Sequence, residues 1–169
     1  MAERTVVLDG FSKTYAMTGW RLGYAIVPEW LSFAFGRLII NSVSNVCSFA
    51  QHGAVEALRG PQDEVDRMVA EFHARRDLVV DGLNAIPGIT CLRPSGAFYV
   101  LPEVSGTGLT GADFANRLLY EAGVSTLAGT AFGRVATDHI RLSYATSQAN
   151  IRTALDRIGQ FVGTLAVSA

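Results

Sequence analysis

A long amphipathic segment at residues 62–84 constrains the fold of this chain more than any other stretch. Apolar side chains recur there at spacings of three and four, with acidic and basic side chains at the positions between them. The apolar positions are Val65, Met68, Val69, Phe72, Val79 and Leu83. This period places them on one face of an α-helix. The pattern therefore predicts a helix of about six turns that buries one face and ends before Pro87.

Short strand patterns and helical patterns surround this segment. Runs rich in β-branched or alternating apolar residues predict strands at residues 5–8, 22–27, 89–92, 97–101, 124–127 and 139–144. Apolar or amphipathic runs predict helices at residues 31–40, 48–58, 112–122 and 152–165. We expect the strand at 5–8 and the helix at 31–40 to be largely buried, because apolar residues occupy most of their positions. The mixture predicts an α/β or mixed α+β fold.

Charge and cysteine content exclude several classes of protein. The chain has 14 basic and 15 acidic residues in 169, and no basic run extends beyond Arg75-Arg76, so we expect no nucleic-acid partner. Two cysteines and three scattered histidines predict neither a disulfide framework nor a metal site. The longest apolar stretch, residues 31–40, is too short for a bilayer, and the start does not resemble a signal peptide. We expect a cytoplasmic chain with no membrane partner.

The balance of charged and apolar residues is unusual. Charged residues make up 17% of the chain, whereas soluble domains have about 25%, and 49% of the residues are hydrophobic. One interpretation is an alanine-rich composition. The other is that a partner or a further domain covers part of the apolar surface.

Lys13 is the only lysine in the chain; the other 13 basic residues are arginines. It lies in a polar segment between two expected strands, and Arg21 follows eight residues later. Loops at strand ends bind ligands in α/β proteins. A lysine can supply the amine of a Schiff base, and an arginine can bind a phosphate with two parallel hydrogen bonds. The pair suggests pyridoxal phosphate, while residue types alone leave a solvated lysine and a packing arginine as the alternative.

The segment at residues 10–24, GFSKTYAMTGWRLGY, resembles the signature of the class I/II aminotransferases, the fold-type I pyridoxal-phosphate enzymes. The family pattern is S-K-x5-G-x-R-x-G-[YW]. In the family, the lysine binds the cofactor through a Schiff base and the arginine binds its phosphate. The resemblance assigns these roles to Lys13 and Arg21, and an accessory role at the phosphate to Ser12.

Two later segments are similar to the same family. Residues 95–99, SGAFY, resemble its G-[AG]-F-Y strand, and residues 139–145, HIRLSYA, resemble the strand whose arginine binds the substrate α-carboxylate. The resemblance assigns that role to Arg141. Strand alternation predicts that Arg141 lies on the face opposite Ile140 and Leu142, as a ligand-facing residue requires. A surface arginine is the alternative from the residue type alone.

The resemblance covers only the C-terminal part of the family pattern. In the family, the preceding portion supplies the aspartate at the pyridine nitrogen and a glycine-rich turn at the phosphate. Asp9 is no replacement, because it stands only four residues before Lys13. Family members also have Pro-Gly where this chain has Ala128-Gly129. We therefore expect little or no transamination by the isolated chain.

The resemblance implies a division of the chain and a set of partners. Residues 1–61 would be a remnant of the large pyridoxal-phosphate domain, 62–84 a connecting helix, and 85–169 the small C-terminal domain. The substrates would be an amino acid and a 2-oxo acid, and the protein partner either a second copy in a homodimer or a missing N-terminal half. Two alternatives stay open: a catalytically incompetent fragment that serves as a folding or assembly module, and a C–S lyase of the same fold.

A glycine pattern at residues 106–111 fits G-x-G-x-x-G and lies between an expected strand and an expected helix. A dinucleotide site would also need an acidic residue at the end of the next strand, where this chain has Ala128-Gly129. Thr110 followed by Asp113 instead predicts a helix cap. We therefore favour a structural role for these glycines.

Overall fold

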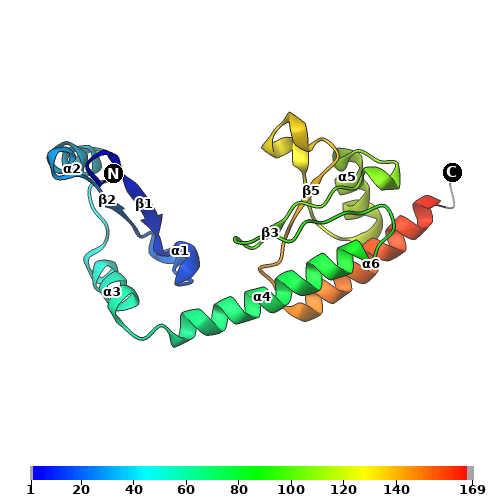
Figure 1. The fold of residues 1–169 in the computed structure, drawn as a ribbon, viewed down its shortest axis with the longest axis horizontal. Coiled ribbons are helices and arrows are strands. Elements are labelled where there is room, and N and C mark those ends of the chain that lie inside the picture. The colour runs from blue at the N-terminus through cyan, green and yellow to red at the C-terminus, as the bar shows by residue number, and fades with distance from the viewer. Residues whose placement is uncertain (1, 167–169) are drawn as a thin grey trace. The chain divides into compact units, whose positions relative to one another are not determined.

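The computed structural model describes residues 2–166, which form two compact units (Figure 1). Unit 1 comprises residues up to Arg67, and unit 2 begins at Met68. The boundary falls inside the helix α4 (Asp63–Asn84), so the long helix predicted for residues 62–84 is confirmed. Asp63, Glu64 and Asp66 in its first turn interact favourably with the helix dipole. Residues 1 and 167–169, at the outer ends of the expected domains, lie outside the described part.

Unit 1 is built on a β-hairpin, whose strands β1 (Val7–Gly10) and β2 (Gly23–Ile26) pair antiparallel. The segment between them, expected as a loop, contains the short helices α1 (Phe11–Thr14) and η2 (Thr18–Trp20). The other helices of the unit are η1 (Ala2–Arg4), α2 (Glu29–Val43) and α3 (Ser48–Arg59). The helix predicted for residues 48–58 is therefore confirmed.

The core of unit 1 is small and lies under the β1–β2 connection. Its buried members are Phe11, Met17, Leu22 and Ala50. The predicted burial of the first strand is wrong, because Val7 is 44% and Leu8 71% exposed. The helix expected at residues 31–40 is present within α2, but no side chain of α2 is buried. The physical reason is that β1 pairs only with β2, and no described element covers the outer apolar faces of the strand and the helix.

Unit 2 contains a three-stranded antiparallel sheet in the order β3-β5-β4. The strands are β3 (Tyr99–Val100), β4 (Leu127–Ala128) and β5 (Ile140–Ser143). The helices besides α4 are η3 (Ser105–Thr107), α5 (Gly111–Ala122), η4 (Gly129–Phe132), η5 (Arg134–Ala136) and α6 (Gln148–Ala166). Helices α4 and α6 lie side by side (Figure 1), so closely that a Cβ at Gly82 would be 2.4 Å from Leu155.

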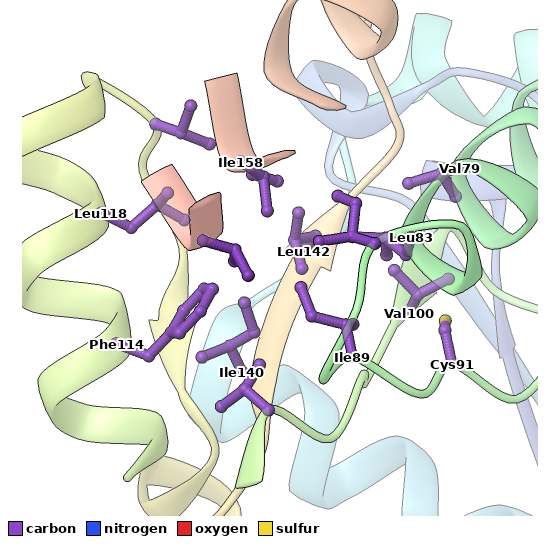
Figure 2. Close-up of a cluster of buried hydrophobic side chains, with 14 of the residues drawn as sticks. Val79, Leu83, Ile89, Cys91, Val100, Phe114, Leu118, Ile140, Leu142 and Ile158 are labelled. Atoms are coloured by element: carbon purple, nitrogen blue, oxygen red, sulfur yellow. The ribbon is translucent and has the colours of Figure 1, made fainter. Parts of the chain in front are cut away.

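A contiguous hydrophobic core fills the space between the sheet and the helices of unit 2 (Figure 2). Side chains with no exposed surface come from α4, α5, β5 and α6, among them Leu83, Phe114, Leu118, Ile140 and Ile158. The rings of Phe114 and Phe161 meet edge to face at 5.3 Å. Burying each such side chain stabilises the fold by about 1.5–3 kcal/mol. The apolar periodicity of the sequence is therefore satisfied in this unit.

Two strand predictions in unit 2 are wrong. At residues 89–92, the side chain of Asn84 takes the backbone hydrogen bonds of Cys91, donating to its carbonyl at 2.9 Å and accepting from its N–H at 2.8 Å. Only an isolated bridge between Thr90 and Glu103 remains there. At residues 124–127, the Val124 N–H caps the preceding helix by donating to the Leu118 carbonyl at 3.3 Å, so β4 begins only at Leu127. Both differences come from side-chain or cap bonds that compete with a strand ladder.

The glycines of the G-x-G-x-x-G pattern have packing roles. A Cβ at Gly106 would lie 2.8 Å from the Cα of Gly88, and one at Gly111 would lie 2.1 Å from the carbonyl oxygen of His139. Thr110 caps α5, because its Oγ1 accepts the Asp113 N–H at 3.2 Å, so the predicted cap is confirmed. Within residues 2–166, no helix is long and apolar enough to span a lipid bilayer.

Candidate functional site

The β1–β2 connection carries Ser12, Lys13 and Arg21, and both of its ends are fixed. Gly10 pairs with Gly23 across the hairpin, and the Phe11 N–H donates to the Leu22 carbonyl at 3.3 Å. A Cβ at Gly23 would lie only 3.1 Å from the backbone oxygen of Asp9, so the strands approach closely at this point. The three polar residues therefore belong to one closed loop.

Aromatic packing ties this loop to the rest of unit 1. The buried ring of Phe11 lies 5.6 Å from the ring of Tyr15 and 5.5 Å from that of Tyr24. On the far side of the loop, Trp20 packs against α3, where a Cβ at Gly53 would come within 2.8 Å of the indole. Lys13 and Arg21 thus follow anchored aromatic residues, which restrict the backbone positions of both.

The backbone of the loop is strained at two non-glycine residues. Ala16 has a φ of 54° and Arg21 a φ of 56°, both in the left-handed region. Such conformations cost of order 1–3 kcal/mol each and concentrate at functional sites. Nη1 of Arg21 donates to the Thr18 carbonyl at 3.0 Å, and the guanidinium makes no other hydrogen bond or ion pair within residues 2–166. Most of its N–H donors are therefore available to an anion.

Lys13 and Ser12 lie on α1, which is a single helical turn. The buried side chain of Phe11 fixes the position of this turn. Lys13 is exposed, whereas Ser12 is half-buried and its hydroxyl makes no hydrogen bond to any described residue. A primary amine, a hydroxyl and a guanidinium therefore share one closed loop. This donor set fits a ligand that carries both an aldehyde and a phosphate.

Asp9 and Tyr24 form a polar contact at the end of the hairpin that the sequence analysis missed. Asp9 accepts the Gly10 N–H at 2.7 Å and the Tyr24 hydroxyl at 3.3 Å. Partial burial and the neighbouring Asp9 carboxylate raise the pKa of Tyr24 above its ordinary value. Asp9 thus stabilises the end of the hairpin. The antiparallel register of β1 and β2 places Tyr24 directly opposite it, so the pairing of the two strands is the signal that would have identified this contact.

Arg141, the remaining predicted site residue, lies in unit 2 on the central strand β5. Its neighbours Ile140 and Leu142 are buried and Arg141 is half-buried, so the predicted alternation is confirmed. The centre of its guanidinium lies 4.4 Å from the centroid of the Tyr99 ring and 4.4 Å from that of the Phe132 ring. Within residues 2–166, no carboxylate forms an ion pair with it. The guanidinium therefore presents N–H donors without an acid to neutralise them.

Comparison with known proteins gives the family. The profile described as Aminotransferase class I and II matches residues 1–158. The chain belongs to the class I and II aminotransferases. It is 42% identical to an aspartate aminotransferase of Pyrococcus horikoshii over 158 residues, which cover 92% of this chain and 40% of that protein. It is 45% identical to an aspartate/prephenate aminotransferase of Cereibacter sphaeroides, covering 96% of this chain and 43% of that one.

Solved aminotransferase structures agree with this assignment. The aspartate aminotransferase from Rhizobium meliloti superposes with a TM-score of 0.90 at 41% identity, covering 96% of this chain and 42% of that structure. The aromatic aminotransferase from Pyrococcus horikoshii gives a TM-score of 0.91 at 36% identity, with coverages of 97% and 44%. The expected mixed α/β fold of fold-type I aminotransferases is therefore confirmed. The aminotransferase chain spans about two fifths of the length of these relatives.

Proposed function

We propose that this chain is the C-terminal portion of a pyridoxal-phosphate-dependent aminotransferase that moves an amino group between an amino acid and a 2-oxo acid. One observation carries the proposal: a closed, strained loop presents the only lysine of the chain together with an arginine whose donors are largely unused. In this proposal, residues 1–61 belong to the large cofactor domain, 62–84 to a connecting helix and 85–169 to the small domain.

Three residues of the loop would bind the cofactor. The Lys13 amine would hold it covalently, the Arg21 guanidinium would bind its phosphate, and the Ser12 hydroxyl would assist. Pyridoxal phosphate, when bound, withdraws electrons from the substrate Cα and so makes the Cα proton removable. The substrate amine would take the place of the Lys13 amine. The released Lys13 amine would then take the Cα proton as a general base and return a proton as a general acid. Lys13 is exposed on the single turn that the buried Phe11 anchors, so this turn presents its side chain at the surface of the loop.

Arg141 would bind the substrate through its α-carboxylate. A planar guanidinium without a carboxylate partner suits two parallel hydrogen bonds to such a group. The relatives are named for aspartate, prephenate and aromatic amino acids. These names support an acidic or aromatic amino acid as the substrate class of the whole protein.

We propose further that the isolated chain has little or no turnover. The chain spans two fifths of its relatives, and unit 1 exposes apolar side chains on β1 and along α2, including Leu8, Trp30, Phe33 and Ile40. A separately encoded N-terminal half or a second copy of the chain would cover them. The same exposed faces favour the second candidate, a catalytically incompetent module that only assembles with such a partner.

The free thiols of Cys47 and Cys91 fit a reducing, cytoplasmic location.

The decisive experiment is a cofactor titration of the purified chain. We expect pyridoxal phosphate to produce a visible absorption band that is absent from Lys13→Ala and from Lys13→Arg, which keeps the charge but cannot form the bond. Weakened binding in Arg21→Gln would assign the phosphate contact. A band of equal strength in both lysine variants would refute the proposed site.

A second measurement distinguishes the reactions open to this fold. The chain would be mixed with amino acids, alone and together with a candidate N-terminal half. Release of a 2-oxo acid with amino transfer supports an aminotransferase, and release of a thiol from a sulfur amino acid supports a lyase. A Lys13-dependent band that amino acids bleach would contradict the incompetent-module alternative.

A further inference from the structure

Arg141 is enclosed on two sides by aromatic rings from segments that flank its strand. Tyr99 lies on β3 and Phe132 ends η4, which follows β4, and these two strands are the neighbours of β5 in the sheet. Each ring centroid lies 4.4 Å from the centre of the guanidinium. Tyr99 is half-buried and Phe132 is 49% exposed, so both rings belong to the surface that Arg141 faces.

Tyr99 is held in place by contacts that extend into the core. The Tyr144 hydroxyl donates to the Ala97 carbonyl at 2.9 Å, which fixes the segment where Ala97 has a left-handed φ of 61°. Phe98 lies 4.5 Å from Tyr99 and packs in turn against Phe72 of α4 at 6.0 Å. This chain of contacts restricts the position of the Tyr99 ring.

Phe132 is held by close backbone packing at the other edge of the sheet. The Gly129 N–H donates to the His139 carbonyl at 2.7 Å. A Cβ at Gly129 would lie 2.2 Å from the Ala136 carbonyl oxygen, so only glycine fits there. The turn that carries Phe132 therefore starts from a fixed point beside β5.

We propose that Tyr99 and Phe132 are positioning residues that hold the Arg141 guanidinium in one orientation for a carboxylate ligand. This inference rests on the carboxylate-binding role proposed above for Arg141. Rings over the guanidinium attract its charge while leaving its N–H groups free to donate in the plane. An arginine side chain has many rotamers, and fixing one before binding lowers the ordering cost of the complex. Removal of one ring should weaken carboxylate binding about two- to fivefold.

The test uses the nitrogen-15-labelled full chain and the NMR resonance of the Arg141 Nε–H group, assigned with Arg141→Lys. Two nearby ring faces shield this proton, so we expect its resonance upfield of the free-arginine position. Titration with pyruvate, a carboxylate with a 2-oxo group, should move it downfield from that position, because a hydrogen bond to a carboxylate deshields the N–H proton. Tyr99→Leu and Phe132→Leu should each move the resonance toward the free position and weaken pyruvate binding.

Conservative variants and a distant tyrosine provide the controls. Tyr99→Phe and Phe132→Tyr keep the rings and should retain both the resonance and the affinity. Tyr120→Leu removes a tyrosine that is 86% exposed on α5 and should change neither. If Tyr99→Leu does not fold, Phe132→Leu provides the same test at a more exposed position.

The outcomes separate this inference from the function on which it rests. A free-arginine resonance in the unmodified chain, or one that both leucine variants leave unchanged, would overturn the positioning role. An upfield resonance that depends on the rings but does not respond to pyruvate would overturn the proposed carboxylate role of Arg141, and with it the purpose we assign to the rings. The ring-dependent resonance together with ring-dependent pyruvate affinity supports both.

Discussion

The two units of the chain differ in how they use their apolar residues. Among the described residues, the core cluster of unit 2 has 19 buried members, whereas that of unit 1 has four. Unit 1 instead exposes large apolar side chains on β1, α2 and α3. The two units have helices and antiparallel strands in common, so secondary structure does not explain the contrast. What differs is whether a second layer of structure covers the apolar faces.

Helices α2 and α5 show this difference on a smaller scale. In α5, Phe114, Ala115 and Leu118 form one buried stripe against the sheet and α6. In α2, apolar residues lie on most sides, and none is buried among the described residues. A helix that is apolar all round requires cover on several sides. The contrast teaches that apolar content predicts the demand for burial, and only neighbouring elements satisfy it.

The largest expected effect tests this contrast with the same substitution in each unit. Leu118→Ala removes a fully buried side chain and should lower the free energy of unfolding by about 2–5 kcal/mol. Leu38→Ala removes one that is 64% exposed and should change it by less than about 0.5 kcal/mol. Urea unfolding followed by circular dichroism measures both. A large loss in Leu38→Ala would reveal that α2 is covered in solution, for example by a second copy.

Glycine substitutions sharpen the same comparison. A Cβ at Gly111 of unit 2 would clash with a backbone oxygen, so Gly111→Ala should destabilise the fold by about 3 kcal/mol. At Gly36, inside α2, nothing lies within 4 Å of an added Cβ, and Gly36→Ala should stabilise that helix by about 1 kcal/mol. Thermal melting of the two variants measures the difference. Equal destabilisation by both would refute an open surface around α2.

The smallest expected effects concern pH. A hydrogen bond from Arg76, with help from Arg93, holds the pKa of Asp77 in unit 2 below its ordinary value of 3.8. Its contribution to stability is present above that value and is lost as the pH falls through the lowered pKa. Tyr24 in unit 1 has a raised pKa, so its contribution is present below pH 10.0 and is lost as the pH rises through the raised pKa.

Two substitutions check these opposite dependences. Asp77→Asn should flatten the acid side of the stability curve, and Tyr24→Phe the alkaline side, in unfolding experiments between pH 2 and 12. Both side chains are partly exposed, so added salt should reduce the Asp77 effect. No change of slope in either variant would show that these contacts do not contribute to the folding equilibrium.

Much of the fold and of the candidate site could be predicted from local patterns. The helix at residues 62–84 was predictable because its apolar residues follow the helical period over six turns. The alternation around Arg141 was predictable because strand side chains alternate between faces. The S-K-x5-G-x-R-x-G pattern indicated Lys13 and Arg21, whose roles stay predictions.

The remaining features depend on contacts between distant segments. The strand expected at residues 89–92 does not form because the side chain of Asn84 binds its backbone, and residue type alone does not reveal that partner. The exposure of β1 and α2 depends on what covers them, which their own sequence does not encode. Tyr99 belongs to the SGAFY motif, but its convergence with Phe132 on Arg141 requires the sheet order β3-β5-β4.

The left-handed backbone of Arg21 bears on which residue type suits this position best. Glycine or asparagine would adopt its φ of 56° with less strain, so the fold alone would favour either of them at this position. The single hydrogen bond that the side chain makes, to a carbonyl three residues earlier, is a weak and exposed compensation. An arginine therefore occupies a position whose backbone conformation disfavours it. The contact with an anion that we propose for Arg21 would account for an arginine at this strained position.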